Sequence, residues 1–355
     1  MTRTMSTWAL SAVAALAASS VGSAQSPPDY AIVKSVPLGA PDRWDYLTFD
    51  PGTNAVYVSH SDRLTVVDAR DGRVLGEVKG FPGGTHGIAI VSALHRGYTD
   101  DGRNGEAASF DLRTLQVKAR LKPAPDADAV VFDPVSGHVF VVNGDTGLLT
   151  VIDPQSDAIV ATIMVGGGLE FSVSGQNGKL YVNGAQKREV VRIDTASNQV
   201  DARWPIPQCE RPHGLAIDTG THRLFVSCVN QRLVAVNADT GAVVAEAPIG
   251  RGTDAAAFDP KRHRVFSSNG IDGTLSVIEE KDAQTLVPVA TVRTARTGRT
   301  MAIDPQSGRI YIAAADLDLS AIAASVTPAS GDSAPPRRPA PIVKGSLKLL
   351  FLDPK

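Results

Sequence analysis

Short apolar segments recur along the chain at nearly constant spacing, and each is followed by a turn rich in Asp, Pro, Gly or similar residues. The first apolar segment of each repeat reads YLTFDP (46–51), GIAIVS (87–92), AVVFDP (129–134), FSVSGQ (171–176), GLAIDT (214–219), AAFDPK (256–261) and MAIDPQ (301–306). Corresponding apolar positions lie 41, 42, 41, 44, 41 and 45 residues apart. Such a period, with about four short strands per repeat, is typical of β-propellers. The pattern therefore predicts an all-β fold, a seven-bladed β-propeller of four-stranded antiparallel blades.

Within one repeat, the four strands follow directly from the apolar pattern. The first repeat predicts strands over Tyr46–Phe49, Ala55–Ser59, Leu64–Val67 and Val74–Val78, separated by turn-forming residues. The first strand of each repeat is rich in Gly and Ala, as expected for the crowded strand nearest the axis. The second strand carries a bulky aromatic residue in six repeats: Tyr57, Phe140, Tyr181, Phe225, Phe266 and Tyr311. We expect these rings to fill the wider space between adjacent blades.

The last repeat is incomplete, and this predicts how the ring closes. Residues 300–355 supply three strands, the last of them over 346–352, and no fourth strand follows. The segment 30–36 precedes the first repeat and has no partner within it. We therefore expect it to be the outer strand of blade 7, which leaves fewer exposed sheet edges. Residues 316–344 form a Pro/Ala-rich insertion, interpreted either as a surface loop or as a flap over the face where the first strands begin.

The first 24 residues have the pattern of a secretory signal peptide. Arg3 precedes an apolar stretch from Trp8 to Ala18 that is too short to span a bilayer, and Gly22-Ser23-Ala24 offers a cleavage site. A retained membrane anchor is the alternative. The mature chain, 25–355, is then expected to be a single, monomeric propeller domain in the periplasm or secreted. It has no stretch of about 20 apolar residues, so no membrane span is expected in it.

Charge and cysteine content narrow the picture further. The formal net charge is −2, or −3 without Arg3, which argues against bulk electrostatic binding to nucleic acids. Cys209 precedes the first strand of one repeat, and Cys228 ends the next strand. Because these strands are antiparallel, both residues lie at the same edge. We predict a Cys209–Cys228 disulfide, which export would permit; two buried free thiols are the alternative.

The segments KLYVNG (179–184), RLFVSC (223–228) and RIYIAA (309–314) resemble YVTN-type β-propeller repeats. The resemblance covers essentially the whole mature chain. It implies an exported protein of the surface-layer-like or periplasmic propeller group. Some members of that group bind DNA or other macromolecules, and many have no assigned activity. More distant seven-bladed relatives include lactonases and a metal-dependent antibiotic lyase, but no local motif carries their catalytic residues over to this chain.

The residues that vary between repeats point to a candidate site at the mouth of the axial channel. The position four residues before each aligned apolar residue is occupied by Asp45, His86, Asp128, Leu169, His213, Asp254 and Arg299, and Glu170 follows Leu169. Three interpretations stand: a water-filled mouth without a specific role, a binding site for a ligand or partner, and a metal or catalytic centre. Asp and His are ligands of divalent metals, and His86, Asp128 and His213 are the candidate ligands. His60 ends the second strand of the blade that carries Asp45, so these two side chains form a candidate acid–base pair.

Three hypotheses for function follow. The leading one is an exported propeller that binds a small molecule or protein at the loop-rich face around the channel, with no certain cofactor and catalytic residues unknown. The second is a metal-dependent hydrolase or lyase, lactonase-like, that uses the acidic and histidine residues of the mouth. The third, nucleic-acid binding, follows only from the family resemblance.

The remaining histidines fall in turns on the opposite face and are expected to be surface residues: His95, His138, His222 and His263.

Overall fold

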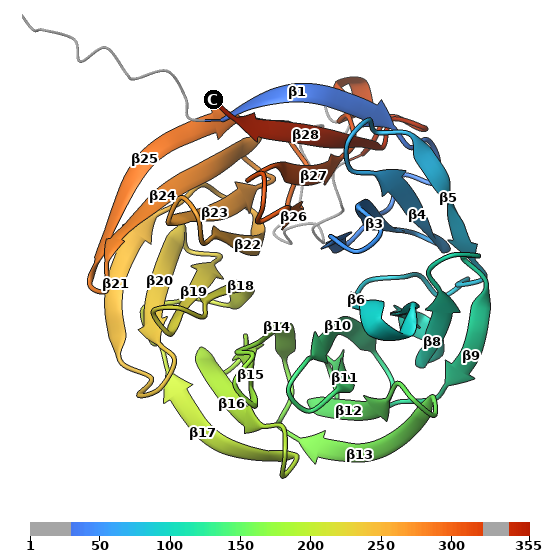
Figure 1. Cartoon of the computed structure of the whole chain (residues 1–355). Helices are drawn as coiled ribbons and strands as arrows, with labels where there is room; N and C mark the ends of the chain where they lie inside the picture. Colours follow the sequence, from blue (N-terminus) through green and yellow to red (C-terminus); the bar gives the residue numbers. More distant parts are fainter. Residues whose placement is uncertain (1–29, 322–340) are drawn as a thin grey trace, which may run out of the picture.

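A computed structural model describes residues 30–321 and 341–355. These residues form seven four-stranded antiparallel sheets, arranged radially around one axis (Figure 1). The predicted seven-bladed β-propeller is confirmed. The predicted signal peptide (1–24) and the middle of the 316–344 insertion lie outside the described residues.

Each blade runs from an innermost to an outermost strand in chain order. Blade 1 comprises β2 (Leu47–Asp50), β3 (Ala55–His60), β4 (Arg63–Asp68) and β5 (Val74–Lys79). Blade 2 comprises β6 (Ile88–Val91), β7 (Arg96–Asp101), β8 (Glu106–Asp111) and β9 (Val117–Leu121), with short 3-10 helices η1 (Ser92–Leu94) and η2 (Gly102–Asn104) in its turns. Blade 3 comprises β10 (Ala127–Asp133), β11 (His138–Asn143), β12 (Leu148–Asp153) and β13 (Ala158–Met164). Blade 4 comprises β14 (Leu169–Ser174), β15 (Lys179–Gly184), β16 (Glu189–Asp194) and β17 (Gln199–Pro205).

The remaining blades follow the same order until the last. Blade 5 comprises β18 (Pro212–Asp218), β19 (Arg223–Cys228), β20 (Arg232–Asn237) and β21 (Val243–Pro248). Blade 6 comprises β22 (Thr253–Asp259), β23 (Arg264–Asn269), β24 (Thr274–Asp282) and β25 (Thr285–Arg293), and its outer two strands are nine residues long. Blade 7 combines β26 (Thr300–Ile303), β27 (Ile310–Ala314) and β28 (Lys348–Pro354) with β1 (Tyr30–Pro37).

The closure of blade 7 by the N-terminal strand is confirmed. β1 pairs antiparallel with β28, from Tyr30 opposite Pro354 to Pro37 opposite Lys348 (Figure 1). The third strand of this blade was predicted over 346–352 and begins two residues later. The cause is a contact with a residue remote in sequence: the backbone N–H groups of Gly345 and Leu347 donate hydrogen bonds to the carboxylate of Asp42, which holds this segment as a turn.

Side-chain size fits the radial geometry. The six predicted aromatic rings of the second strands are all fully buried between blades, as is Tyr98 in blade 2. Nearer the axis, neighbouring innermost strands approach so closely that a Cβ at Gly87 would collide with the backbone of Asp128–Val130, and one at Gly214 with the backbone of Ala255–Ala256. Glycine at these two positions therefore permits tight packing around the axis, directly beside the ring of polar residues.

The predicted disulfide is also confirmed. Cys209 and Cys228 are bonded, with Cα atoms 5.2 Å apart, and both are fully buried. The bond ties the loop that enters blade 5 to the end of β19. Because that loop leads directly to His213, the disulfide anchors one side of the candidate site.

Candidate functional site

The predicted ring residues gather at the entrance to the axis, where the innermost strands begin. Their carboxylate, imidazole and guanidinium groups lie close enough to affect one another's charge across several blades. All are partly buried: Asp45, His86, Asp128, Glu170, His213, Asp254 and Arg299. We refer to these seven residues as the mouth ring.

His86 is held by a buried carboxylate that sequence reasoning missed. Nδ1 of His86 lies 2.7 Å from Oδ2 of Asp100, and the backbone N–H groups of His86 and Gly87 donate to Oδ1 of the same residue. Burial disfavours the charged imidazolium, but the hydrogen bond and charge of Asp100 outweigh it and raise the pKa of His86 to about 9. The ring is therefore protonated at neutral pH, which makes it a poor general base.

The other side of the ring is a chain of alternating charges. Arg299 donates from Nε to Asp254 at 2.6 Å, and its Nη2 lies 3.4 Å from Oδ2 of Asp45. The second oxygen of Asp254 lies 2.8 Å from Nδ1 of His213, whose Nε2 is 3.8 Å from Glu170. Burial opposes ionisation of Asp254, but its two partners lower its pKa. For Asp45, burial dominates the attraction of Arg299 and raises the pKa to about 6.

Asp128 differs from the other carboxylates of the mouth ring, because its carboxyl group makes no hydrogen bond or ion pair with any residue that the structure describes. Burial, and then the charge of Asp45, raise its pKa well above the ordinary value. It lines a cavity of about 480 Å³ between blades 3 and 4. The charged residues around this cavity are mainly acidic: Asp126, Asp128, Asp145 and Glu170, with Arg188 and Arg211.

The suggested pairing of His60 with Asp45 is wrong. The ring of His60 is almost fully buried, with Nδ1 2.7 Å from the hydroxyl of Thr65 and Nε2 2.7 Å from the carbonyl of Pro41. Burial lowers the pKa of this histidine. Both nitrogens are thus used to fix the loop that precedes β2, and the sequence alone gave no sign that Pro41 would reach this position.

The proposed metal ligands do not form a compact set. Among the described residues, the one group of three acidic or histidine side chains with ligand atoms within 4.8 Å of each other is Asp218, His263 and Glu280. His86, Asp128 and His213 stay in separate parts of the mouth ring, each with its own surroundings. A metal centre built from these three therefore remains a prediction without geometric support.

Tyr46 is a further mouth residue that sequence reasoning missed. It projects from blade 1 across the axis and packs edge-to-face on Phe171 of blade 4, with ring centroids 4.9 Å apart. Burial and the nearby carboxylates, first among them Asp128, raise its pKa well above the ordinary value. The repeat alignment carried a signal for it, because the equivalent position in five other repeats holds a small residue: Gly87, Ala129, Gly214, Ala255 and Thr300.

Replacement of Tyr46 by Ala is expected to destabilise the fold by about 3–4 kcal/mol, because it leaves a cavity where a large ring linked opposite blades. Tyr46→Phe keeps the packing and serves as the control, with a loss below about 1.5 kcal/mol. Chemical denaturation of both variants measures the difference. Equal, small losses would show that the contact across the axis contributes little.

A second cavity, of about 400 Å³, lies next to Arg299 and is mostly apolar. The guanidinium lies 5.7 Å from the ring centroid of Trp44, in a cation–π contact. Leu317 and Ile342, the described ends of the 316–344 insertion, pair with each other and line the same cavity. The insertion therefore departs from the propeller beside the mouth ring, on the face that the strand directions predicted.

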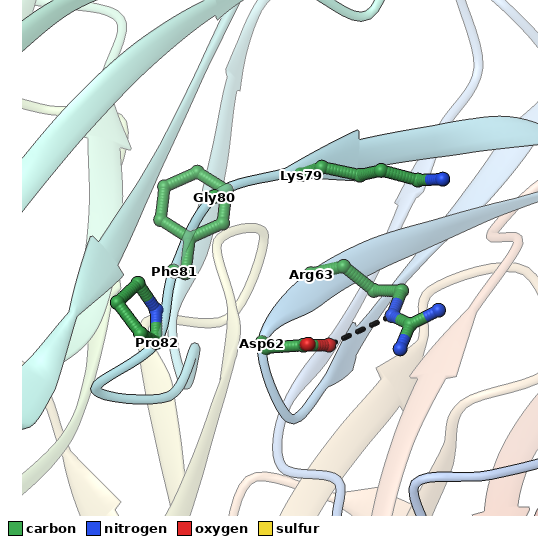
Figure 2. Close-up of a pocket in the computed structure, with 6 residues that line it drawn as sticks. All are labelled: Asp62, Arg63, Lys79, Gly80, Phe81 and Pro82. Carbon is green, nitrogen blue, oxygen red and sulfur yellow. Dashed lines mark hydrogen bonds and ion pairs between the residues drawn. The ribbon is translucent and has the colours of Figure 1, made fainter.

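A third hollow lies between the loops of blade 1 and is shown in Figure 2. Its charged groups are engaged with one another: Arg63 donates to Asp62 at 2.8 Å and contacts Glu77, and Glu77 also pairs with Lys79. Phe81 forms an apolar wall and is fully buried. With its charges paired in this way, the hollow is a weaker candidate than the acidic cavity beside Asp128.

Comparisons with known proteins agree with the fold and leave the activity open. No family model matches the sequence. The chain is 24% identical over 246 residues to the "Uncharacterized protein YncE" of Salmonella typhimurium, covering 64% of this chain and 67% of that protein, and 23% identical over 246 residues to its counterpart in Salmonella typhi, with the same coverage.

Two solved structures share the architecture. Hydrazine synthase of Kuenenia stuttgartiensis superposes with a TM-score of 0.67 and 16% identity, over 76% of this chain and 92% of that one. A chain of the mitotic checkpoint complex superposes with a TM-score of 0.73 and 13% identity, over 98% of both chains. Within the described residues, no helix has the length and apolar character needed to cross a membrane. The chain is thus similar to these proteins in fold, and the mouth ring is the feature that bears on its function.

Proposed function

We propose that the protein is a binding protein that takes a cationic group, such as an ammonium or guanidinium, in the acidic cavity beside the axial channel. The observation that carries this proposal is Asp128, a partly buried carboxyl group at the wall of a cavity of about 480 Å³ that has no partner among the described residues. A cation placed there would meet a charge-assisted acceptor that the protein itself leaves unused.

The surroundings support a cation rather than an anion. Glu170 lines the same cavity, and burial raises its pKa, so it too gains from a positive neighbour. The cationic members of the mouth ring are committed elsewhere: His86 to Asp100, and Arg299 to Asp254 and Asp45. Arg188 and Arg211 also line the cavity and His213 lies near Glu170, but the four acidic side chains outnumber the two arginines in the lining, which favours organic cations or basic side chains of a partner.

The other two hypotheses find less support. The His86–Asp100 pair does not supply a general base at neutral pH, because the imidazole of His86 is protonated. A metal-dependent hydrolase would need its metal ligands close together at the mouth, whereas His86, Asp128 and His213 do not form a compact set. Nucleic-acid binding would place phosphates against the acidic cavity, where repulsion opposes it.

We further propose that the protein works as a monomer in the periplasm or after secretion, as the predicted signal peptide and the YVTN-type repeats imply. The Cys209–Cys228 disulfide supports an oxidising compartment. The similarity to YncE, a protein described as uncharacterized, supports a propeller of the same general kind and suggests no particular activity.

Asp128→Asn tests the binding proposal. Isothermal titration with agmatine as the probe is expected to give saturable binding to the unmodified protein and at least about 10-fold weaker binding to the variant, because a charged acceptor is replaced by a neutral amide. Binding is also expected to weaken as the pH falls, because the cation favours the ionised form of a carboxyl group whose pKa is raised. Glutarate, a dianion, is expected not to bind.

The matched control is Glu246→Gln on the outer strand β21, where Glu246 pairs with Arg232 at the surface. This variant removes the same charge far from the axis and should bind agmatine like the unmodified protein. Equal affinity of the Asp128→Asn variant, or a preference for glutarate, would contradict the proposal.

A further inference from the structure

Three side chains of the metal-ligand type meet on the face opposite the mouth, between blades 5 and 6. Asp218 ends β18 of blade 5, His263 lies in the turn between β22 and β23, and Glu280 belongs to β24. One ligand atom from each lies within 4.8 Å of the other two. Two ligands of one ion bound at ~2.0–2.2 Å lie at most about 4.4 Å apart, so small side-chain movements bring these three atoms within reach of a single ion.

A hydrogen bond that recurs in the propeller explains why these residues meet. In several blades an Asp, Asn or Glu lies near the end of the third strand. The backbone N–H of the next residue donates a hydrogen bond to a carbonyl in the turn between the first two strands. The residue that carries this carbonyl has a left-handed backbone conformation. In blade 5 this bond joins Ala238 to His222, and in blade 6 it joins Glu280 to His263 at 2.9 Å. The backbone thus fixes Glu280 next to the turn that carries His263.

Glu280 is an exception among the residues at this position. The other blades place a buried uncharged residue there: Ala69, Leu112, Pro154, Thr195 and Ala238. β24 continues past this point to Asp282, so the unusually long hairpin of blade 6 carries a carboxylate into a site that is elsewhere uncharged. Sequence reasoning treated His263 as an ordinary turn residue because this extension was not apparent from the period.

The carboxylate of Glu280 is buried and incompletely satisfied. The residue is only 6% exposed, and Oε2 has no hydrogen-bond partner in the part of the chain that the structure describes. The single hydroxyl of Thr221 lies 2.7 Å from Oδ2 of Asp218 and 3.2 Å from Oε1 of Glu280, so one proton faces two carboxylates. Burying an unpartnered carboxylate oxygen next to a second carboxylate is costly unless a cation or a proton joins them.

The charges around the pair leave room for a cation. The guanidinium of Arg223 is directed to the carbonyls of Ala283 and Thr221. Among the residues that the structure describes, no cationic side chain forms an ion pair with either carboxylate.

We propose that Asp218, His263 and Glu280 bind a divalent cation of the zinc type that bridges blades 5 and 6. Two carboxylates and an imidazole form the mixed oxygen and nitrogen donor set that suits Zn²⁺ better than Ca²⁺, which prefers oxygen ligands alone. His263 is exposed, so water can complete the coordination sphere and the ion can enter from solvent. The site takes ligands from two blades, so the ion stabilises the ring.

Zinc titration of the chelator-treated, full-length mature protein tests the proposal. Isothermal titration calorimetry is expected to give one equivalent of Zn²⁺ bound, and the melting temperature is expected to rise with zinc, because the ion binds only the folded chain. Glu280→Gln and His263→Ala are each expected to weaken binding at least about 100-fold, which exceeds the ~10–100-fold effect of residues outside the coordination sphere.

His222→Ala is the matched control. His222 occupies the equivalent turn of blade 5 and faces only one carboxylate, that of Asp239 at 3.0 Å. This variant should bind zinc like the unmodified protein. Since His263 is exposed, its replacement leaves the core intact, which circular dichroism verifies. Zinc binding that survives either Glu280→Gln or His263→Ala, the absence of stoichiometric binding, or a preference for Ca²⁺ over Zn²⁺ would each overturn the proposal.

Discussion

A chain that lacks residues 25–38 is expected to lose at least ~5 kcal/mol of folding free energy, which lowers the melting temperature by roughly 10 °C or more. The deletion removes β1, the outer strand of blade 7, and with it the ladder to β28. It also removes Tyr30, which is 1% exposed and packs edge-to-face on Phe266 of blade 6 with centroids 5.1 Å apart. β28 becomes an unprotected edge, so self-association is expected as well.

Two single substitutions separate the role of the strand from that of the deletion itself. Tyr30→Ala removes the buried ring and should account for about 3–4 kcal/mol of the loss. Val33→Ala changes an exposed residue of the same strand, 55% accessible, and should cost less than about 0.5 kcal/mol. Thermal unfolding and size-exclusion chromatography measure these outcomes. A truncated protein that melts at the unchanged temperature would show that the ring does not depend on this closure.

The fold was predictable from the sequence because each blade repeats the same pattern of short apolar strands and turn-forming residues. The seven first strands share turn residues and small side chains, and the broken seventh copy revealed that a strand from the N-terminus was needed. The first and last residues of a strand were harder to predict where a residue remote in sequence contacts the end of that strand. The start of β28 moved by two residues because Asp42, remote in sequence, binds the preceding turn.

The candidate site was predictable only in part. The repeat phase identified the positions of the mouth ring, since equivalent positions of a radial fold meet at the axis. It did not identify which side chains pair. Asp100 lies on a second strand and escaped notice because the alignment considered only first strands, whereas its contact with His86 depends on how β7 lies within its blade. His60 was misinterpreted for the reverse reason, because a loop outside the repeat supplies its partner.

Tyr46 and Glu280 illustrate a more general point. Both are residues that break the repeat at a position that most other repeats fill with small or uncharged side chains. Such exceptions are visible in the sequence, but their consequence depends on what faces them across the axis or across the blade boundary. Sequence comparison of the repeats therefore indicates where to look, and the three-dimensional neighbours determine what the residue does.

Arg299→Met is expected to destabilise the protein by about 2–4 kcal/mol at pH 8, somewhat less than the ~3–5 kcal/mol of a fully buried pair because 37% of the arginine side chain is exposed. The guanidinium is the shared partner of Asp254 and Asp45, and it also donates to the carbonyl of Trp44 at 3.2 Å. Without it, two neighbouring carboxylates remain partly buried, offset only by the mouth histidines His213 and His86. Methionine preserves much of the side-chain volume, so the loss reports mainly on charge.

The dependence of this loss on pH distinguishes charge from packing. In the unmodified protein the pKa of Asp45 is raised to about 6, so its contribution to stability is present below its ordinary value of 3.8 and disappears as the pH rises through 6. Removal of Arg299 raises the pKa of Asp45 further and removes one of the two partners that lower the pKa of Asp254, so ionisation of both carboxyl groups becomes less favourable in the folded protein. The difference in unfolding free energy between variant and unmodified protein should therefore be small near pH 4 and grow towards pH 8.

Arg232→Met, at an exposed pair with Glu246, should cost less than about 1 kcal/mol with little dependence on pH. A loss for Arg299→Met that is equal at pH 4 and pH 8 would mean that the arginine stabilises the mouth ring by contact with Trp44 and not by neutralising its acids.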